Sequence, residues 1–184
     1  DIVALSKGLG AGYCPLGAMI AHSRLVKPVL DRGGFAHGYT YAGNPLACAA
    51  GLAVLDEIER QDLLGNATRI GDLLKAELEC LAERYPFIGD VRGKGLLLAA
   101  EFVSDRKTMA PLPKALDAHQ RVVDIAYARG LIIYSRRTRG GVEGDHFLVC
   151  PPMITTEAQV GEIVTILDAT LAQLAGELSL PVTK

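Results

Sequence analysis

The feature that most restricts the fold is a short apolar run, IVAL at residues 2–5, followed at once by Ser6, Lys7 and a glycine-rich stretch. A short, partly β-branched apolar run that ends at glycines is typical of a fully buried strand in an α/β protein. Lys7 then stands at the C-terminal end of that strand. Ligands bind at this edge of α/β sheets, because the loops that leave it can vary without disturbing the core.

The rest of the chain mixes helical and strand patterns. Asn44 as N-cap and Pro45 at the first helical position predict the start of a helix, and Thr156 with Gln159 forms a capping box at the start of the last helix. The predicted strands are 16–22, 96–103, 131–135 and 145–151, and the predicted helices are 23–30, 46–60, a segment from a break around Gly65 to Arg84, 115–130, and the segment after Thr156. This order suggests a small α+β domain joined to part of an α/β domain.

Composition excludes several classes of partner. The 184 residues include 49% hydrophobic side chains, enough for a core, and a net charge of −2 with no tryptophan argues against nucleic acid. No apolar run approaches the roughly 20 residues needed to cross a bilayer, so we expect no membrane insertion. The first residues also lack the order of a signal peptide, which makes the cytoplasm the expected compartment.

The cysteines and histidines give no metal signal. The four cysteines never form a C-x-x-C pair, and the four histidines do not stand at metal-ligand spacing with them. We therefore predict no metal site, and we interpret the cysteines as small buried apolar residues in a reducing compartment.

Two interpretations of Lys7 follow from its position. It is either an ordinary solvated charge beside a flexible loop, or an amine held in place for chemistry. A lysine becomes a nucleophile when its ammonium is easily deprotonated, and partial burial favours this by penalising the charged form. The main use of such a lysine is a Schiff base with a carbonyl compound or with pyridoxal phosphate (PLP).

Four blocks of the chain resemble one enzyme family. DIVALSKGLGAGYCPLGAMIAH (residues 1–22) resembles the PLP-lysine motif of the class III, omega-type aminotransferases, which have the aspartate-aminotransferase fold (fold type I). HGYTYAGNPLACAAGLAVL (37–55), VRGKGLLLAAEF (91–102) and GDHFLVCPPMITTEAQVGEIV (144–164) are similar to later segments of the same family, in the same order. The resemblance implies that residues 1–60 are the C-terminal part of the large PLP-binding domain and residues 61–184 the small C-terminal domain.

The resemblance also implies roles for two residues. Lys7 matches the lysine that forms the Schiff base with PLP and, once released, moves a proton as a base. Thr40 matches the threonine whose hydroxyl binds the PLP phosphate of the neighbouring subunit, which implies a homodimer or higher homo-oligomer. Without the resemblance, we would interpret Thr40 as a loop hydroxyl that satisfies its own turn.

Substrate recognition is the least determined part. In this family an arginine often binds the carboxylate of the 2-oxo acid, and the candidates in YSRRTRGGVEGDH are Arg136, Arg137 and Arg139. Relatives often have an arginine before GDH, where this chain has Glu143. Each arginine can equally be interpreted as a solvated loop charge.

The implied activity is PLP-dependent transfer of an amino group from an amine or omega-amino acid to a 2-oxo acid such as pyruvate. The aspartate that binds the pyridine nitrogen, the glycine-serine phosphate loop and the aromatic residue stacked on the ring have no counterpart here. We therefore expect a truncated, inactive C-terminal portion that exposes apolar faces around residues 2–5 and 17–22. The alternatives are a racemase, aminomutase or decarboxylase of the same fold, or a non-catalytic oligomerising module derived from it.

Overall fold

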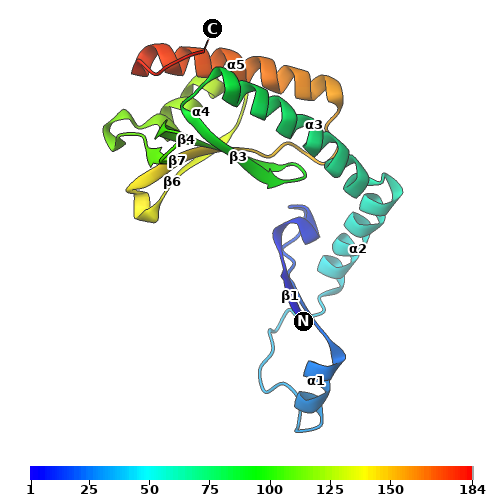
Figure 1. The fold of residues 1–184 in the computed structure, drawn as a ribbon. Coiled ribbons are helices and arrows are strands. Elements are labelled where there is room, and N and C mark those ends of the chain that lie inside the picture. The colour runs from blue at the N-terminus through cyan, green and yellow to red at the C-terminus, as the bar shows by residue number, and fades with distance from the viewer. Residues whose placement is uncertain (184) are drawn as a thin grey trace. The chain divides into compact units, whose positions relative to one another are not determined.

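The computed structural model describes residues 1–183, and of Arg139 it describes only the main chain. The chain forms two compact units (Figure 1). The first unit is Asp1–Asp62, and the second begins at Leu63.

The first unit contains two short strands and two helices. Strand β1 (Ile2–Leu5) pairs antiparallel with β2 (Ala18–Ala21), and a 3₁₀ turn, η1 (Lys7–Gly10), directly follows β1. Helix α1 (Ser23–Leu30) follows β2, and α2 (Pro45–Arg60) closes the unit. The predicted start of α2 is confirmed, since the side-chain oxygen of Asn44 accepts the backbone N–H of Ala47 at 3.1 Å.

The prediction that residues 2–5 form a buried strand is half right. The strand exists, but all its residues are exposed, with Ile2 at 61% and Val3 at 51% of their full accessibility. Its partner strand is equally open, with Met19 at 61% and Ile20 at 57%. A two-stranded sheet with no layer packed over it leaves both faces in solvent. The expected exposure of apolar faces in this region is therefore confirmed, and the expected burial of the strand within this chain is wrong.

The second unit is built on one antiparallel sheet. Its strands are β3 (Ile88–Lys94), β4 (Leu97–Asp105), β5 (Ala110–Pro111), β6 (Tyr134–Thr138) and β7 (Glu143–Val149). The order is β3-β4-β7-β6, and β5 pairs with β4. Strand β6 is therefore an edge strand beside β7.

Two features of this sheet differ from the sequence prediction. Strand β3 is absent from that prediction because its sequence, IGDVRGK, carries charges and glycines that are typical of a loop. The predicted strand at 131–135 lies three residues further along, at Tyr134–Thr138. Of the apolar residues that suggested it, Leu131 donates its N–H to the Ala126 carbonyl and closes the preceding helix, Ile133 is only 7% exposed, and Ile132 is 82% exposed.

Three helices lie on the same side of this sheet (Figure 1). Helix α3 (Leu63–Arg84) contacts β3, α4 (Ala118–Ala128) contacts β6 and β7, and α5 (Glu157–Leu178) packs against α3 and α4. Two further 3₁₀ turns are η2 (Lys114–Leu116) and η3 (Arg139–Gly141). The break before α3 lies at Gln61–Asp62 and not around Gly65, which is inside the helix.

The core of the second unit is aromatic at its centre. Tyr85, Phe87, Phe102 and Phe147 are at most 1% exposed and form a chain with ring centroids 5.5 to 5.8 Å apart. Tilted ring pairs at this spacing add stabilisation beyond the area they bury. The capping box at Thr156 and Gln159 is confirmed, so α5 begins where the sequence predicts.

The interpretation of the cysteines as buried residues is wrong for this chain. Cys48, Cys80 and Cys150 are exposed, and Cys14 is half-buried. Two of them lie on helix faces that point to solvent, which a single small side chain does not reveal in the sequence. No helix within residues 1–183 is long and apolar enough to span a membrane.

Candidate active site

Lys7 begins the 3₁₀ turn that follows β1. Its φ of 49° lies in the left-handed region, while Ser6 before it is extended. A residue other than glycine in this region carries about 1–2 kcal/mol of backbone strain. Such strain is often found at functional positions. The Lys7 side chain is exposed and makes no hydrogen bond or ion pair with the described residues. Its amine is therefore free to react, and this unit leaves it in solvent.

Thr40 lies in the loop that leads into α2. The loop is closed by main-chain bonds, from Ala42 N–H to the Tyr39 carbonyl at 2.9 Å and from Asn44 N–H to the Tyr41 carbonyl at 3.1 Å. Among residues 1–183 the Thr40 hydroxyl has no hydrogen-bond partner, and the residue is exposed. The turn therefore does not use the hydroxyl, which leaves it available to an anion.

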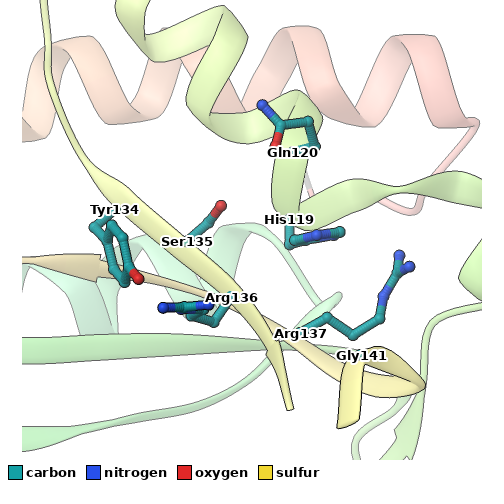
Figure 2. A pocket seen from close by; sticks show the side chains of 7 residues that line it. All are labelled: His119, Gln120, Tyr134, Ser135, Arg136, Arg137 and Gly141. Atoms are coloured by element: carbon teal, nitrogen blue, oxygen red, sulfur yellow. The ribbon is translucent and has the colours of Figure 1, made fainter.

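Arg136 and Arg137 lie on opposite faces of β6, as neighbours in a strand must. The guanidinium of Arg136 lies over the ring of Tyr134, with Cζ 5.3 Å from the ring centroid, and the residue is exposed. In Figure 2, Ser135 points toward the start of α4, away from Tyr134 and Arg136. These side chains surround an open pocket of about 400 Å³, which is lined by His119, Gln120, Tyr134, Ser135, Arg136, Arg137 and Gly141.

Arg137 is engaged within the unit. Its side chain is 7% exposed, and its Nε donates to Asp145 Oδ1 at 2.6 Å. Its terminal nitrogen donates to Asp145 Oδ2, to Asp117 Oδ1 and to the Lys114 carbonyl at 3.0 to 3.1 Å. Binding a substrate carboxylate would require this guanidinium to leave its partners.

Asp145 is the site residue that the sequence did not reveal. It is 3% exposed on β7, and it also accepts the backbone N–H of His119 at 3.1 Å. Burial by itself raises the pKa of Asp145, but the hydrogen bonds from Arg137 and His119 outweigh it and hold the pKa below the ordinary value. The signal available in the sequence was a carboxylate beside an apolar run, in GDHFLV.

The remaining sequence candidates are placed only in part. The side chain of Arg139 lies outside the described part of the structure, although its main chain begins η3. Lys7 and Thr40 belong to the first unit, whereas the arginines belong to the second. No group of three or more His, Cys, Asp or Glu residues within the described chain could hold a metal ion.

Comparison with known proteins gives a consistent result. The family model described as aminotransferase class-III matches residues 1–171. An uncharacterized aminotransferase, y4uB, of Sinorhizobium fredii is 38% identical over 97% of this chain. The taurine–pyruvate aminotransferase of Bilophila wadsworthia is 35% identical over 91% of this chain. In both cases the chain spans 38% of the length of the relative.

A solved structure agrees with these sequence matches. An amine transaminase from an uncultivated Pseudomonas species, in its PLP-bound form, superposes with a TM-score of 0.84 at 41% identity. The match covers 95% of this chain and 38% of that one. The chain thus has part of the fold-type-I architecture of PLP-dependent transaminases. On the family model and these relatives together, the chain belongs to the class III aminotransferase family.

Proposed function

We propose that the protein to which this chain belongs transfers an amino group from an amine or omega-amino acid to a 2-oxo acid such as pyruvate. The observation that carries the proposal is Lys7, an exposed amine without a partner in the described chain, at the end of β1 in a segment that matches the family model. The name of the Bilophila relative, which pairs taurine with pyruvate, supports this substrate class.

The two candidate cofactor ligands in this chain, Lys7 and Thr40, suit the binding of PLP. Lys7 Nζ would hold the cofactor covalently. The free Thr40 hydroxyl would bind a phosphate oxygen of the PLP that is held in the neighbouring subunit. When bound, PLP supplies an electron sink for the carbon that carries the amino group. Lys7 Nζ, once released by the substrate amine, would take the proton from that substrate carbon and deliver it to the cofactor carbon to which Lys7 had been bound.

Arg136 is our candidate for the substrate carboxylate. Its guanidinium is exposed beside the pocket and lies against the Tyr134 ring without a hydrogen bond to any described residue, so it keeps its donors for a ligand. Two parallel N–H bonds to a carboxylate suit this fork geometry. Arg137 is less suited, because its donors already bind Asp145, Asp117 and Lys114.

The extent of the chain bears on its activity. We propose that residues 1–60 belong to the large PLP-binding domain and residues 61–184 to the small domain, and that the active protein is a homodimer in the cytoplasm. The open faces of β1 and β2 support contact with further structure. The 184-residue chain alone is expected to show no turnover, because Lys7 and Thr40 are the only cofactor ligands proposed within it.

Borohydride reduction tests the proposed role of Lys7. The whole protein with PLP should be yellow, and reduction should fix the cofactor on the peptide that contains Lys7, as read by mass spectrometry. Lys7→Arg keeps the charge but cannot form the covalent bond, so the label should be lost. Lys27→Arg is the matched control, since Lys27 pairs with Asp31 at 2.8 Å on the exposed face of α1. A label that persists in Lys7→Arg rejects the assignment.

Product analysis separates transamination from the alternatives. With an amine donor and pyruvate, the proposed activity forms alanine in equal amount to the carbonyl product. A racemase or aminomutase would change the donor without consuming pyruvate, and a decarboxylase would release CO₂. A protein that binds no PLP would favour the non-catalytic module.

A further inference from the structure

One buried carboxylate joins three elements beside the pocket. Both oxygens of Asp145, on β7, are engaged: Oδ1 by Arg137 of β6 at 2.6 Å, and Oδ2 by the same guanidinium at 3.1 Å. Oδ2 also lies 3.1 Å from the backbone nitrogen and 3.3 Å from the ring Nδ1 of His119, in the first turn of α4. Asp145 thus ties β6, β7 and the N-terminus of α4 together.

The cluster that surrounds Asp145 extends to the loop before α4. Arg137 reaches Asp117 Oδ1 and the Lys114 carbonyl, so one guanidinium spans from the edge strand to the end of η2. The side chains of Arg137 and Asp145 are only 7% and 4% exposed. A buried ion pair contributes little net stability compared with apolar residues of the same volume. What the pair supplies is a fixed geometry.

This fixed geometry affects β6, the strand that carries Arg136, our candidate for binding the substrate carboxylate. The pairing of β6 with β7 has a register shift between Arg137 and Thr138, so the strand is redirected directly after Arg137. Since neighbouring side chains in a strand point to opposite faces, a fixed inward Arg137 also fixes an outward Arg136 over Tyr134. Figure 2 shows Arg137 on the His119 side of the strand.

We infer that Asp145 is a positioning residue for carboxylate recognition: through its hold on Arg137 and the start of α4, it sets the place of Arg136 at the pocket. This inference rests on the proposed function, in which Arg136 binds the carboxylate of the 2-oxo acid. Asp145 itself does not touch the substrate. Removal of the Asp145 carboxylate loosens β6 and displaces the guanidinium of Arg136.

Chemical modification of arginine tests whether Asp145 holds Arg137, and this test does not depend on enzyme activity. With phenylglyoxal and mass spectrometry on the chain, Arg136 should react readily and Arg137 slowly, because Arg137 is buried and paired. In Asp145→Asn the Arg137 rate should rise toward that of Arg136. Asp90→Asn is the matched control, since Asp90 also pairs with an arginine, Arg92 at 2.7 Å, but this pair lies within one strand and in solvent. Unchanged Arg137 protection in Asp145→Asn overturns the inference.

Acceptor selectivity in the whole enzyme tests the consequence. Asp145→Asn should lower kcat/KM for pyruvate by about 10- to 100-fold, mainly through KM, since a displacement of about 1 Å can cost that much. Activity with propanal, an acceptor without a carboxylate, should stay within about twofold of the unaltered enzyme. Asp145→Glu should partly restore pyruvate use. A purely structural role would reduce both acceptors together and would overturn the inference.

The same assay distinguishes the inference from the function on which it rests. Arg136→Ala should show the same loss with pyruvate and not with propanal. An unaltered enzyme that transfers no amino group would reject the proposed function, while the phenylglyoxal result would still decide whether Asp145 holds Arg137. Loss of pyruvate selectivity in Arg136→Ala but not in Asp145→Asn would keep the function and reject the inference.

Discussion

At the scale of single residues, two glycines allow a helix and a hairpin of the second unit to approach each other closely. Gly71 lies in the middle of α3, and Gly95 forms the turn between β3 and β4 with φ at +54°. A Cβ added to Gly71 would collide with the main-chain carbonyl of Gly95. Main-chain atoms cannot rotate away as a flexible side chain does, so helix and hairpin would have to separate.

We therefore expect Gly71→Ala to destabilise the second unit by about 1–3 kcal/mol through overpacking. Gly161→Ala is the matched control, since Gly161 is also helical and a Cβ added there would meet no atom within 4 Å. That control should stabilise the chain by about 0.5–1 kcal/mol, because alanine favours a helix. Urea unfolding followed by circular dichroism measures both, and equal midpoints for the two variants would contradict the expectation.

At the scale of elements, the start of α5 is determined by hydrogen bonds within four residues. Thr156 Oγ1 accepts the Gln159 N–H at 3.3 Å, and the Gln159 side chain accepts the Thr156 N–H at 2.9 Å. Thr156→Ala should lower the free energy of unfolding by about 1 kcal/mol, since a first-turn donor loses its partner. Thr156→Ser keeps the hydroxyl and should cost only a few tenths of that. Thermal unfolding checks the difference, and equal losses in both variants would assign the effect to the lost methyl group.

A second link between elements joins the end of α3 to α5. Tyr85 is fully buried, and its hydroxyl donates to Asp168 Oδ1 at 2.6 Å. Burial, with the hydrogen bond to Asp168 as a further cause, raises the pKa of Tyr85 to about 12. The folded state thus holds this proton more tightly than the unfolded chain, in which tyrosine has a pKa of about 10.

The direction of the pH effect follows from this shift. The stabilising contribution of Tyr85 is fully present below about pH 10 and is lost as the pH rises toward about 12. Tyr85→Phe should be less stable than the unaltered chain at pH 8, and the difference should shrink between pH 10 and 12. Urea unfolding at several pH values measures it. A difference that is constant with pH would show that the hydroxyl contributes only through packing.

At the scale of the whole chain, the buried core is unevenly distributed. Of the buried apolar side chains in the described chain, only Ala47 belongs to the first unit. The contiguous core runs from Ile70 to Ala175 in the second unit. Since apolar burial is the main favourable term in folding, the second unit holds most of the stability of this chain.

Limited proteolysis should reflect that distribution. We expect the first cuts in the exposed loop at 31–44, followed by loss of the first unit, while a product that begins near Leu63 persists. A chain that starts at Leu63 should then unfold with the same midpoint as the persistent product. Cuts in α4 or the β3–β4 hairpin that are as fast as those in the loop would contradict the proposed distribution of stability.

Features that depend on near neighbours could be predicted from the sequence alone. The caps at Asn44 and Thr156 are confirmed because their hydrogen bonds lie within one helical turn, and the motifs around Lys7 and Thr40 indicated the family that the comparisons confirm. The roles of Lys7 and Thr40 themselves stay predictions. These features need no knowledge of what packs on them.

Which side of β6 each arginine takes depends on the tertiary fold. Arg136 and Arg137 are equivalent in sequence, but pairing with β7 brings Asp145 to Arg137 and leaves Arg136 over Tyr134. Strand β3 could not be predicted from the sequence for the same reason, because its stability comes from pairing with β4 and not from its own apolar content. Strand pairing and burial depend on residues far apart in the chain, and local sequence does not encode which of them will meet.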